Sequence, residues 1–229
     1  MTIYVGIDDT DMPDTPGTGR IARAVASRLS PNCTVTGITR HQLYVHPDIP
    51  YTSHNSCEVI HCEGGDRDEI FALTREILLD HQVKGSDPGI AVADTLSLGP
   101  SAVAFGIDAK RTILTQAQAR TIAKYSDILL EGLGGTEGGV IGALAGIGLA
   151  STGNDGRFVQ KDHLRDLHDI QDSAILLKGG VDLILTADGL SVTEGNIRFR
   201  KFPKPSLLRG KAVLFVQAVN GYYEEIIRD

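Results

Sequence analysis

Three carboxylates, Asp8, Asp9 and Asp11, follow the apolar run from Ile3 to Val5 within four positions of one another. The run predicts a buried strand, so the carboxylates stand where that strand ends. Carboxylates this close repel one another unless a cation or strong hydrogen-bond donors compensate their charge. Hard oxygen ligands are those that magnesium prefers. We therefore predict a magnesium site here, with an acidic surface turn that bonds local backbone N–H groups as the alternative.

A Gly/Thr-rich turn, residues 15–19, comes next and leads into a helical pattern that ends at Leu29. Gly17 and Gly19 would let the backbone approach a ligand closely. Thr18 would stand at the N-cap of the helix, which is a common position for threonine. Phosphate oxygens also bind at helix N-termini, so capping and phosphate binding are compatible roles for this turn.

A second glycine-rich loop, residues 134–139, precedes a run of small and apolar residues that predicts a helix over 140–148. Glycines ahead of a helix can form a nest of N–H groups that binds an anion. The loop lacks the Lys-Ser/Thr ending of a P-loop and does not match the dinucleotide-binding fingerprint. The alternative is a flexible turn, with the glycines of the helix used for close packing; each glycine costs roughly 1 kcal/mol there relative to alanine.

Two further groups of side chains could bind ligands. Four histidines lie within about twenty residues: His41, His46, His54 and His61. Such a group could bind zinc, but its spacing matches no common zinc motif. Contact with phosphate or substrate is the alternative function. A basic stretch from Arg198 to Lys211 surrounds Phe199 and Phe202. It predicts either a polyanion contact or a solvated strand face.

The order of predicted elements indicates an α+β fold. Strand, helix, strand, strand, helix and strand follow one another, which is the ferredoxin-like or split β-α-β order. These elements span residues 3–7, 19–29, 34–45, 57–62, 67–82 and 90–93. A helix over 115–130, with Thr115 and Gln118 at capping-box spacing, precedes the second glycine loop. We place the first domain at residues 1–157.

Residues 158–229 are predicted to form a small, mostly β module of barrel-like form. A short helix is expected over 162–170, before a series of strands separated by Gly-containing turns. The expected strands span residues 174–178, 182–186, 190–193, 197–202 and 211–218.

Composition narrows the class of protein. The chain has 229 residues and a net charge of −7, which argues against a surface that binds nucleic acid over its whole extent. Its three cysteines, Cys33, Cys57 and Cys62, form no C-x-x-C pair and fit free thiols in a reducing cytoplasm. No signal-peptide pattern is evident. The apolar run from Val140 to Ala150 is too short to span a bilayer, so no membrane partner is expected.

Five motifs, taken in order, resemble the archaeal agmatinylcytidine synthetase (TiaS) family, which modifies an isoleucine tRNA, over roughly residues 1–155. Each motif alone has low specificity, whereas the ordered set is fairly specific. They are residues 6–11 (Gly-Ile-Asp-Asp-Thr-Asp), the turn with Thr18, Pro47-x-Ile49-Pro50-Tyr51 with Asn55, Asp87-Pro88-Gly89 with Asp94, and residues 139–145.

That family activates the wobble cytidine of a tRNA with ATP through a phosphorylated intermediate and then adds agmatine. The resemblance implies a kinase-like region that uses ATP and magnesium, packed with a ferredoxin-like domain. It implies that Asp8, Asp9 and Asp11 hold magnesium, and that Asp9 and Thr18 act in catalysis, with Thr18 near the γ-phosphate. The nucleotide-binding residues that it implies are Thr10, Gly17, Gly19, Gly138, Gly139 and Gly142.

The chain also departs from the family. It lacks the cysteine pairs of the family's zinc ribbon, and Thr52-Ser53-His54 replace the basic residues that follow the Pro-Tyr loop. We therefore expect an ATP- and magnesium-dependent phosphotransferase or ATP-activating ligase whose acceptor, a small molecule or a nucleic acid, differs from tRNA-Ile. The alternatives are a non-catalytic nucleotide-binding regulator, and a tRNA-modifying enzyme whose tRNA contacts come from the C-terminal module or a partner chain. A homo-oligomer is compatible with each of these three functions.

Overall fold

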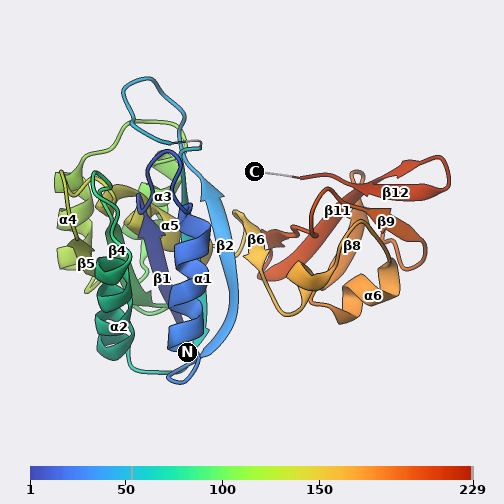
Figure 1. The fold of residues 1–229 in the computed structure, drawn as a ribbon, viewed down its shortest axis with the longest axis horizontal. Helices are drawn as coiled ribbons and strands as arrows, with labels where there is room; N and C mark the ends of the chain where they lie inside the picture. The colour runs from blue at the N-terminus through green and yellow to red at the C-terminus, as the bar shows by residue number, and fades with distance from the viewer. Residues whose placement is uncertain (53, 228–229) are drawn as a thin grey trace. The chain divides into compact units, whose positions relative to one another are not determined.

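The computed structural model describes residues 1–52 and 54–227 and divides the chain into two compact units, Met1–Thr152 and Gly153–Asp229 (Figure 1). The boundary expected from the sequence lies five residues later, at residue 157. Helices and strands are mixed in both units, which confirms the α+β prediction. Within the described residues, the helices are all too short or too polar to cross a membrane.

The first unit is built on a five-stranded sheet in the order β5-β4-β1-β3-β2. Every neighbouring pair in it is antiparallel. The end of β1 therefore lies beside the start of β4, and Asp8 pairs with Gly89. The strands are β1 (Thr2–Asp8), β2 (Thr34–Gln42), β3 (Ser56–Glu63), β4 (Gly89–Asp94) and β5 (Leu129–Gly132).

Helices cover both faces of this sheet. Helices α1 and α2 pack on each other and on one face, whereas α5 packs on β1, β3 and β4 from the other side and is itself covered by α3 and α4 (Figure 1). Side chains alternate along a strand, so Tyr4 and Gly6 face α5 while Ile3, Val5 and Ile7 face away from it. The helices are α1 (Thr18–Leu29), α2 (Arg67–Asp80), α3 (Pro100–Asp108), α4 (Gln116–Tyr125) and α5 (Val140–Ser151).

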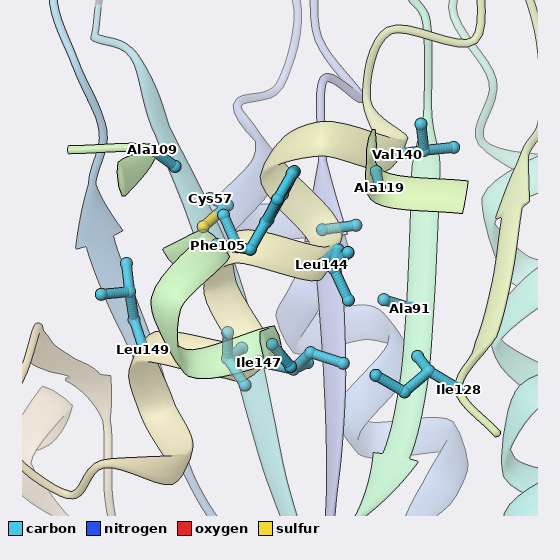
Figure 2. Close-up of a cluster of buried hydrophobic side chains, with 14 of the residues drawn as sticks. Cys57, Ala91, Phe105, Ala109, Ala119, Ile128, Val140, Leu144, Ile147 and Leu149 are labelled. Carbon is cyan, nitrogen blue, oxygen red and sulfur yellow. The ribbon is translucent and has the colours of Figure 1, made fainter. Parts of the chain in front are cut away.

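Helix α5 is the centre of the first unit, and ten of its twelve residues are buried. Glycines let its backbone approach its neighbours. A Cβ on Gly6 would lie 2.2 Å from the carbonyl oxygen of Ala143, and a Cβ on Gly148 would lie 2.2 Å from that of Ala102. The close approach brings Leu144 and the other apolar side chains of α5 into one cluster with α3 and the sheet (Figure 2). Tight packing thus offsets the low helix propensity of these glycines.

The second unit has its own core. Its strands follow the order β6-β10-β11-β12-β9-β7, with β8 parallel to β11. The buried residues that pack in it include Leu164, Leu176, Ile184, Ile197, Phe199 and Leu214. The elements are β6 (Arg157–Gln160), β7 (Ile170–Asp172), α6 (Ser173–Lys178), β8 (Leu183–Thr186), β9 (Asn196–Arg198), β10 (Ser206–Leu208), β11 (Lys211–Val219) and β12 (Tyr222–Glu225).

Several predictions of helices and strands in the second unit were wrong. Residues 174–178 form helix α6 and not a strand, because the Asp172 side chain caps them by accepting from the backbone N–H of Ala174. The helix expected over 162–170 is only a 3-10 turn, Leu164–Asp166. The 190–193 strand is reduced to one isolated bridge, Leu185 to Ser191.

The first unit also contains elements that the sequence did not indicate. Helix α4 begins with the predicted capping box but ends at Tyr125, and a positive φ at Asp127 turns the chain into β5. Helix α3 is short and apolar and has no marked amphipathic period, so its pattern gave no signal.

Candidate functional site

A cavity of about 180 Å³ opens in the first unit, where β1 ends beside the start of β4. One part of its lining carries carboxylates and hydroxyls, and the other part is apolar. None of the described residues that line it is lysine or arginine. The polar part includes Asp8, Asp9, Asp11, Thr18, Asp87 and Thr136, and the apolar part includes Leu43, Ile49, Pro50, Tyr51, Ile113, Leu114 and Ile141.

The Asp11 carboxylate collects hydroxyl donors from two sides. Thr18 donates to its Oδ1 over 3.1 Å, and Thr52 donates to its Oδ2 over 3.2 Å. The Thr10 hydroxyl, which is buried, in turn donates to Thr18 Oγ1 over 3.1 Å. A chain of hydroxyls therefore fixes the orientation of Thr18 at the cavity wall.

Thr18 does not cap helix α1, which corrects the sequence-based interpretation. The N-cap is Gly17, whose φ of −63° and ψ of 157° are extended, and no side chain caps this helix end. Thr18 is the first helical residue, and its hydroxyl points to Asp11 instead of to the helix backbone. The hydroxyl is thus committed to the acid cluster.

Asp8 lies where the sheet meets helix α5. A Cβ on Gly142 would come within 1.8 Å of Asp8 Oδ2, so only glycine at that position leaves room for the carboxylate against the first turn of α5. Burial raises the pKa of Asp8 well above its usual value, and the neighbouring carboxylates of Asp9, Asp11 and Glu58 raise it further. A backbone hydrogen bond at Asp9 opposes the shift.

Asp9 takes the left-handed conformation with a φ of 53°, so the chain turns sharply directly after β1. Burial, together with the carboxylates of Asp87 and Asp11, raises the pKa of Asp9 to about 6. Negative charge is therefore crowded at this point of the cavity, and a bound cation would relieve it.

The second glycine loop is wound around Asp87. The backbone N–H and the hydroxyl of Thr136 donate to the two carboxylate oxygens of Asp87, over 2.8 and 2.5 Å. The backbone N–H of Gly139 donates to the Asp87 carbonyl oxygen over 3.1 Å. A Cβ on Gly139 would lie 2.4 Å from that oxygen and 2.5 Å from the Gly89 nitrogen, so this glycine packs against β4.

The structure thus brings together six of the residues that were predicted to form the site, and they line the cavity: Asp8, Asp9, Asp11, Thr18, Gly138 and Gly142. Four others lie behind that lining. Thr10 supports Thr18, Gly17 is the N-cap of helix α1, Gly139 packs on β4, and a Cβ on Gly19 would lie 3.3 Å from Glu58 Oε1.

Sequence reasoning missed Thr136 as a site residue, and it gave Asp87 no role in the site although Asp87 belongs to one of the five motifs. Asp87 stands in a Ser-Asp-Pro-Gly stretch, and such stretches are typical of turns, so its type and context indicated turn chemistry. Thr136 lies between glycines and carried no signal beyond theirs. The tertiary contact between the two shows that Asp87 and Thr136 act together.

The donor set fits a hard divalent cation. All its charged members are carboxylates, and the pKa values of Asp8 and Asp9 are raised in a way that bound positive charge would reverse. Over residues 1–52 and 54–227, no three His, Cys, Asp or Glu side chains are grouped as ligands of one ion. Magnesium does not need such a group, since it commonly takes one or two carboxylates together with water and phosphate oxygens.

Two of the four histidines are core residues. Thr39 Oγ1 lies 2.7 Å from His41 Nε2 and 2.8 Å from His61 Nε2, and both rings are buried. One hydroxyl carries one proton, so it donates to one ring and accepts from the other. Burial, together with the neighbouring His41, lowers the pKa of His61 to about 3. His54, by contrast, lines the cavity.

The basic stretch of the second unit is partly structural. Phe199 is buried in the core, and the Arg198 guanidinium lies 4.5 Å from the centre of the Tyr222 ring. The Phe202 ring is flanked by Arg165 at 4.3 Å and by Lys204 at 5.2 Å. Cations stacked on aromatic rings occur both in folded surfaces and in nucleic-acid contacts.

No family model matches the chain, and no curated protein matches it. Solved structures do. A crystal structure of apo TiaS, described as an agmatidine synthetase of an isoleucine tRNA, is 25% identical with a TM-score of 0.56, over 65% of this chain and 35% of that one. A tRNA fluorescent labeling enzyme is 27% identical with a TM-score of 0.55, over 65% and 36%.

A complex of TiaS with that isoleucine tRNA and ATP is 26% identical with a TM-score of 0.55, again over 65% of this chain and 36% of that one. The chain therefore spans about a third of the length of the structures that it matches. The resemblance seen in five short motifs is confirmed in three dimensions: about two-thirds of this chain has a TiaS-like fold.

Proposed function

We propose that the cavity binds ATP with magnesium and that the chain is an ATP-dependent phosphotransferase or ATP-activating ligase. The observation that carries the proposal is the meeting of the carboxylates of Asp8, Asp9 and Asp11 with a glycine-rich loop at one cavity whose described lining has no lysine or arginine. A polyphosphate would be repelled there unless a divalent cation accompanied it. The similarity to a TiaS structure with bound ATP supports the choice of nucleotide.

The two parts of the cavity suit the two ends of a nucleotide. The apolar part around Ile113, Leu114 and Ile141 would contact the base, and the polar part would face the phosphates. The volume is below the range of about 300–1,000 Å³ usual for small-molecule sites, so the cavity would enclose only part of a nucleotide. Gly138 and the start of α5 would bring N–H groups to a phosphate.

Asp9 and Asp11 would hold magnesium from the cavity wall, with Asp8 buried behind them. The ion would neutralise phosphate charge, which is the main catalytic contribution in phosphoryl transfer. Thr18 would present its hydroxyl beside the terminal phosphate, oriented by its donation to Asp11 and its acceptance from Thr10. Positioning and charge compensation, and not covalent chemistry at the carboxylates, would carry the reaction.

We also propose that the first unit has a ferredoxin-like arrangement with a kinase-like region. The order β4-β1-β3-β2, with α1 following β1 and α2 following β3, supports a split β-α-β or ferredoxin-like arrangement. A kinase-like region would then comprise the acid turn after β1 together with the loop before α5.

Binding of nucleotide to the purified full chain tests the proposal. Isothermal titration with ATP should give a measurable Kd with magnesium, and binding should weaken at least about tenfold when EDTA removes the ion. Asp9→Asn and Thr18→Ala should reduce phosphate release by at least about tenfold. Asp14→Asn is the matched control, because Asp14 also has a positive φ, of 68°, in the same loop but does not line the cavity.

No binding at millimolar ATP in the presence of magnesium would overturn the proposal. Magnesium-dependent binding without turnover would favour the non-catalytic nucleotide-binding alternative over the enzyme. Turnover that is equal in Asp9→Asn and wild type would place the chemistry elsewhere.

A nucleic-acid acceptor is the second candidate, and the basic stretch of the second unit supports it. Arg200 and Lys201 are exposed there, next to the cation-flanked Phe202 ring. Binding of a fluorescent tRNA should weaken steeply with salt and fall several-fold in Arg200→Glu. Absent or salt-independent binding would leave a small-molecule acceptor.

A further inference from the structure

We propose that Asp87 is a positioning residue that holds the glycine-rich loop, residues 134–139, against the acid cluster, and that its carboxylate binds the loop and not the cation. This inference rests on the proposed nucleotide-binding function. It assigns a role to a residue that lines the cavity but lies outside the predicted acid and glycine motifs.

Asp87 is fixed by the sheet. It stands two residues before β4, whose first residue, Gly89, pairs with Asp8 at the end of β1. Its position relative to the acid cluster is therefore set by the hydrogen bonds of two central strands. Sites that are built on such rigid elements hold their geometry more closely than sites built on loops alone.

The loop then takes its shape from Asp87. The carboxylate accepts both the N–H and the hydroxyl of Thr136, over 2.8 and 2.5 Å, and the carbonyl oxygen of Asp87 accepts from Gly139 N–H. Asp87 thus bonds the middle and the end of the loop at once. Thr136 bonds both carboxylate oxygens and so fixes the carboxylate plane toward the loop, which favours a role in holding the loop.

Steric contacts around Asp87 agree with this role. Gly135 has a φ of +57°, and a Cβ on it would overlap Asp87 Oδ1 at 1.3 Å. A Cβ on Gly138 would lie 3.6 Å from Asp87 Oδ2. The glycines of the loop therefore let its backbone wrap closely around one carboxylate and bring Gly138 to the cavity lining.

A second set of bonds ties the outer side of the loop. Gln116 donates to the Thr136 carbonyl oxygen over 2.7 Å, and Arg120 is paired with Glu137. Neither Gln116 nor Arg120 lines the cavity, whereas Asp87, Thr136 and Gly138 do. Loss of these outer contacts should therefore loosen the loop at the place where a phosphate would bind less than loss of the Asp87 contacts would.

The test compares Asp87→Ala and Thr136→Val with Arg120→Ala, all in the full chain. Thr136→Val removes the hydroxyl donor and keeps the N–H donor. We expect Mg-ATP affinity to fall about 10- to 100-fold in Asp87→Ala and about tenfold in Thr136→Val, while Arg120→Ala stays within about threefold of wild type. In a variant with both Asp87→Ala and Thr136→Val, Mg-ATP affinity should fall by less than the product of the two single effects. The reason is that the two changes remove the same interaction.

Two readouts separate positioning from cation binding. The magnesium concentration for half-maximal ATP binding should move by less than about twofold in either variant, whereas loss of a metal ligand would shift it by about tenfold or more. Amide hydrogen exchange of residues 134–139 without nucleotide should be faster in Asp87→Ala than in Arg120→Ala.

The inference is overturned if Asp87→Ala binds Mg-ATP as wild type does, or if it shifts the magnesium requirement while Thr136→Val is neutral. The exchange measurement needs no ligand. It therefore tests the loop contact even if wild type fails to bind ATP, an outcome that would instead refute the proposed function.

Discussion

At the residue scale, the carboxylates of the acid cluster carry a cost in stability. Asp8 and Asp9 have raised pKa values because burial and neighbouring carboxylates disfavour their charged forms. Such perturbed groups, gathered in a cavity, are typical of functional sites. The chain retains repulsion that neutral side chains would remove, which agrees with a site whose compensating charge arrives with its ligand.

Asp9→Asn is therefore expected to stabilise the ligand-free chain at pH 8, by on the order of 1 kcal/mol. The pKa of Asp9 is about 6 in the folded chain and 3.8 for an ordinary aspartate, so the folded state binds more protons between these values. Stability of the wild type falls as pH rises through this window. Urea unfolding should show the advantage of the variant at pH 8 and little difference near pH 4; a variant less stable at pH 8 would contradict this account.

His61 predicts the opposite pH dependence. Its pKa is about 3 in the folded chain and 6.5 for an ordinary histidine, so the unfolded state binds the additional proton between those values. Stability should decrease as pH falls from about 6.5, by about 1 kcal/mol per pH unit. In His61→Gln the unfolding free energy should fall less steeply from pH 7 to pH 5. The control His46→Gln, on the loop after β2, should follow wild type.

At the element scale, helix α5 determines whether the site can form, since its first turn holds the Asp8 carboxylate against Gly142. The helix is buried on almost all sides and approaches β1 through Gly6. A glycine that permits close backbone contact cannot be replaced without moving one of the two elements. Packing of α5 and geometry of the cavity are thus linked.

Gly6→Ala should destabilise the chain by about 2 kcal/mol or more, because its Cβ would lie 2.2 Å from the Ala143 carbonyl oxygen and 2.9 Å from Ile147 Cγ2. Gly99→Ala is the control, since no atom lies within 4 Å of its Cβ position; it should cost no more than about 1 kcal/mol, the loss of a favourable N-cap residue. Thermal unfolding of both variants measures the difference. Equal losses would show that α5 can shift freely.

At the scale of the whole molecule, all the described residues that line the cavity belong to the first unit, Met1–Thr152. Each unit has its own buried cluster. The two units therefore divide the candidate functions: nucleotide binding in the first, and any polyanion contact of the basic stretch in the second.

A chain that ends at Thr152 should fold cooperatively and bind Mg-ATP within about threefold of the full chain. Calorimetry of unfolding and ATP titration measure both properties. Retained folding with lost binding would show that the second unit contributes to the site. In the same experiment, any tRNA binding should disappear with residues 153–229.

The main elements of the first unit and four polar side chains of the cavity, those of Asp8, Asp9, Asp11 and Thr18, could be predicted from the sequence alone. Apolar periodicity locates β1, α1, β3 and α2 within a few residues, because one face of each is buried. The acid cluster was visible because it places three carboxylates directly after a buried strand. In the second unit, apolar periodicity predicted a strand over residues 174–178. This short apolar run instead forms a helix whose first turn is capped by the Asp172 side chain.

How those residues are used depends on the tertiary structure. Thr18 has the type and position of a cap, yet its hydroxyl bonds to Asp11, seven residues away. Asp87 has the sequence context of a turn, yet it holds a loop 49 residues further along the chain. Local sequence records backbone preference and burial, whereas these contacts depend on which strand ends meet. The antiparallel pairing of β1 with β4 brings them together and makes one cavity of several separate segments.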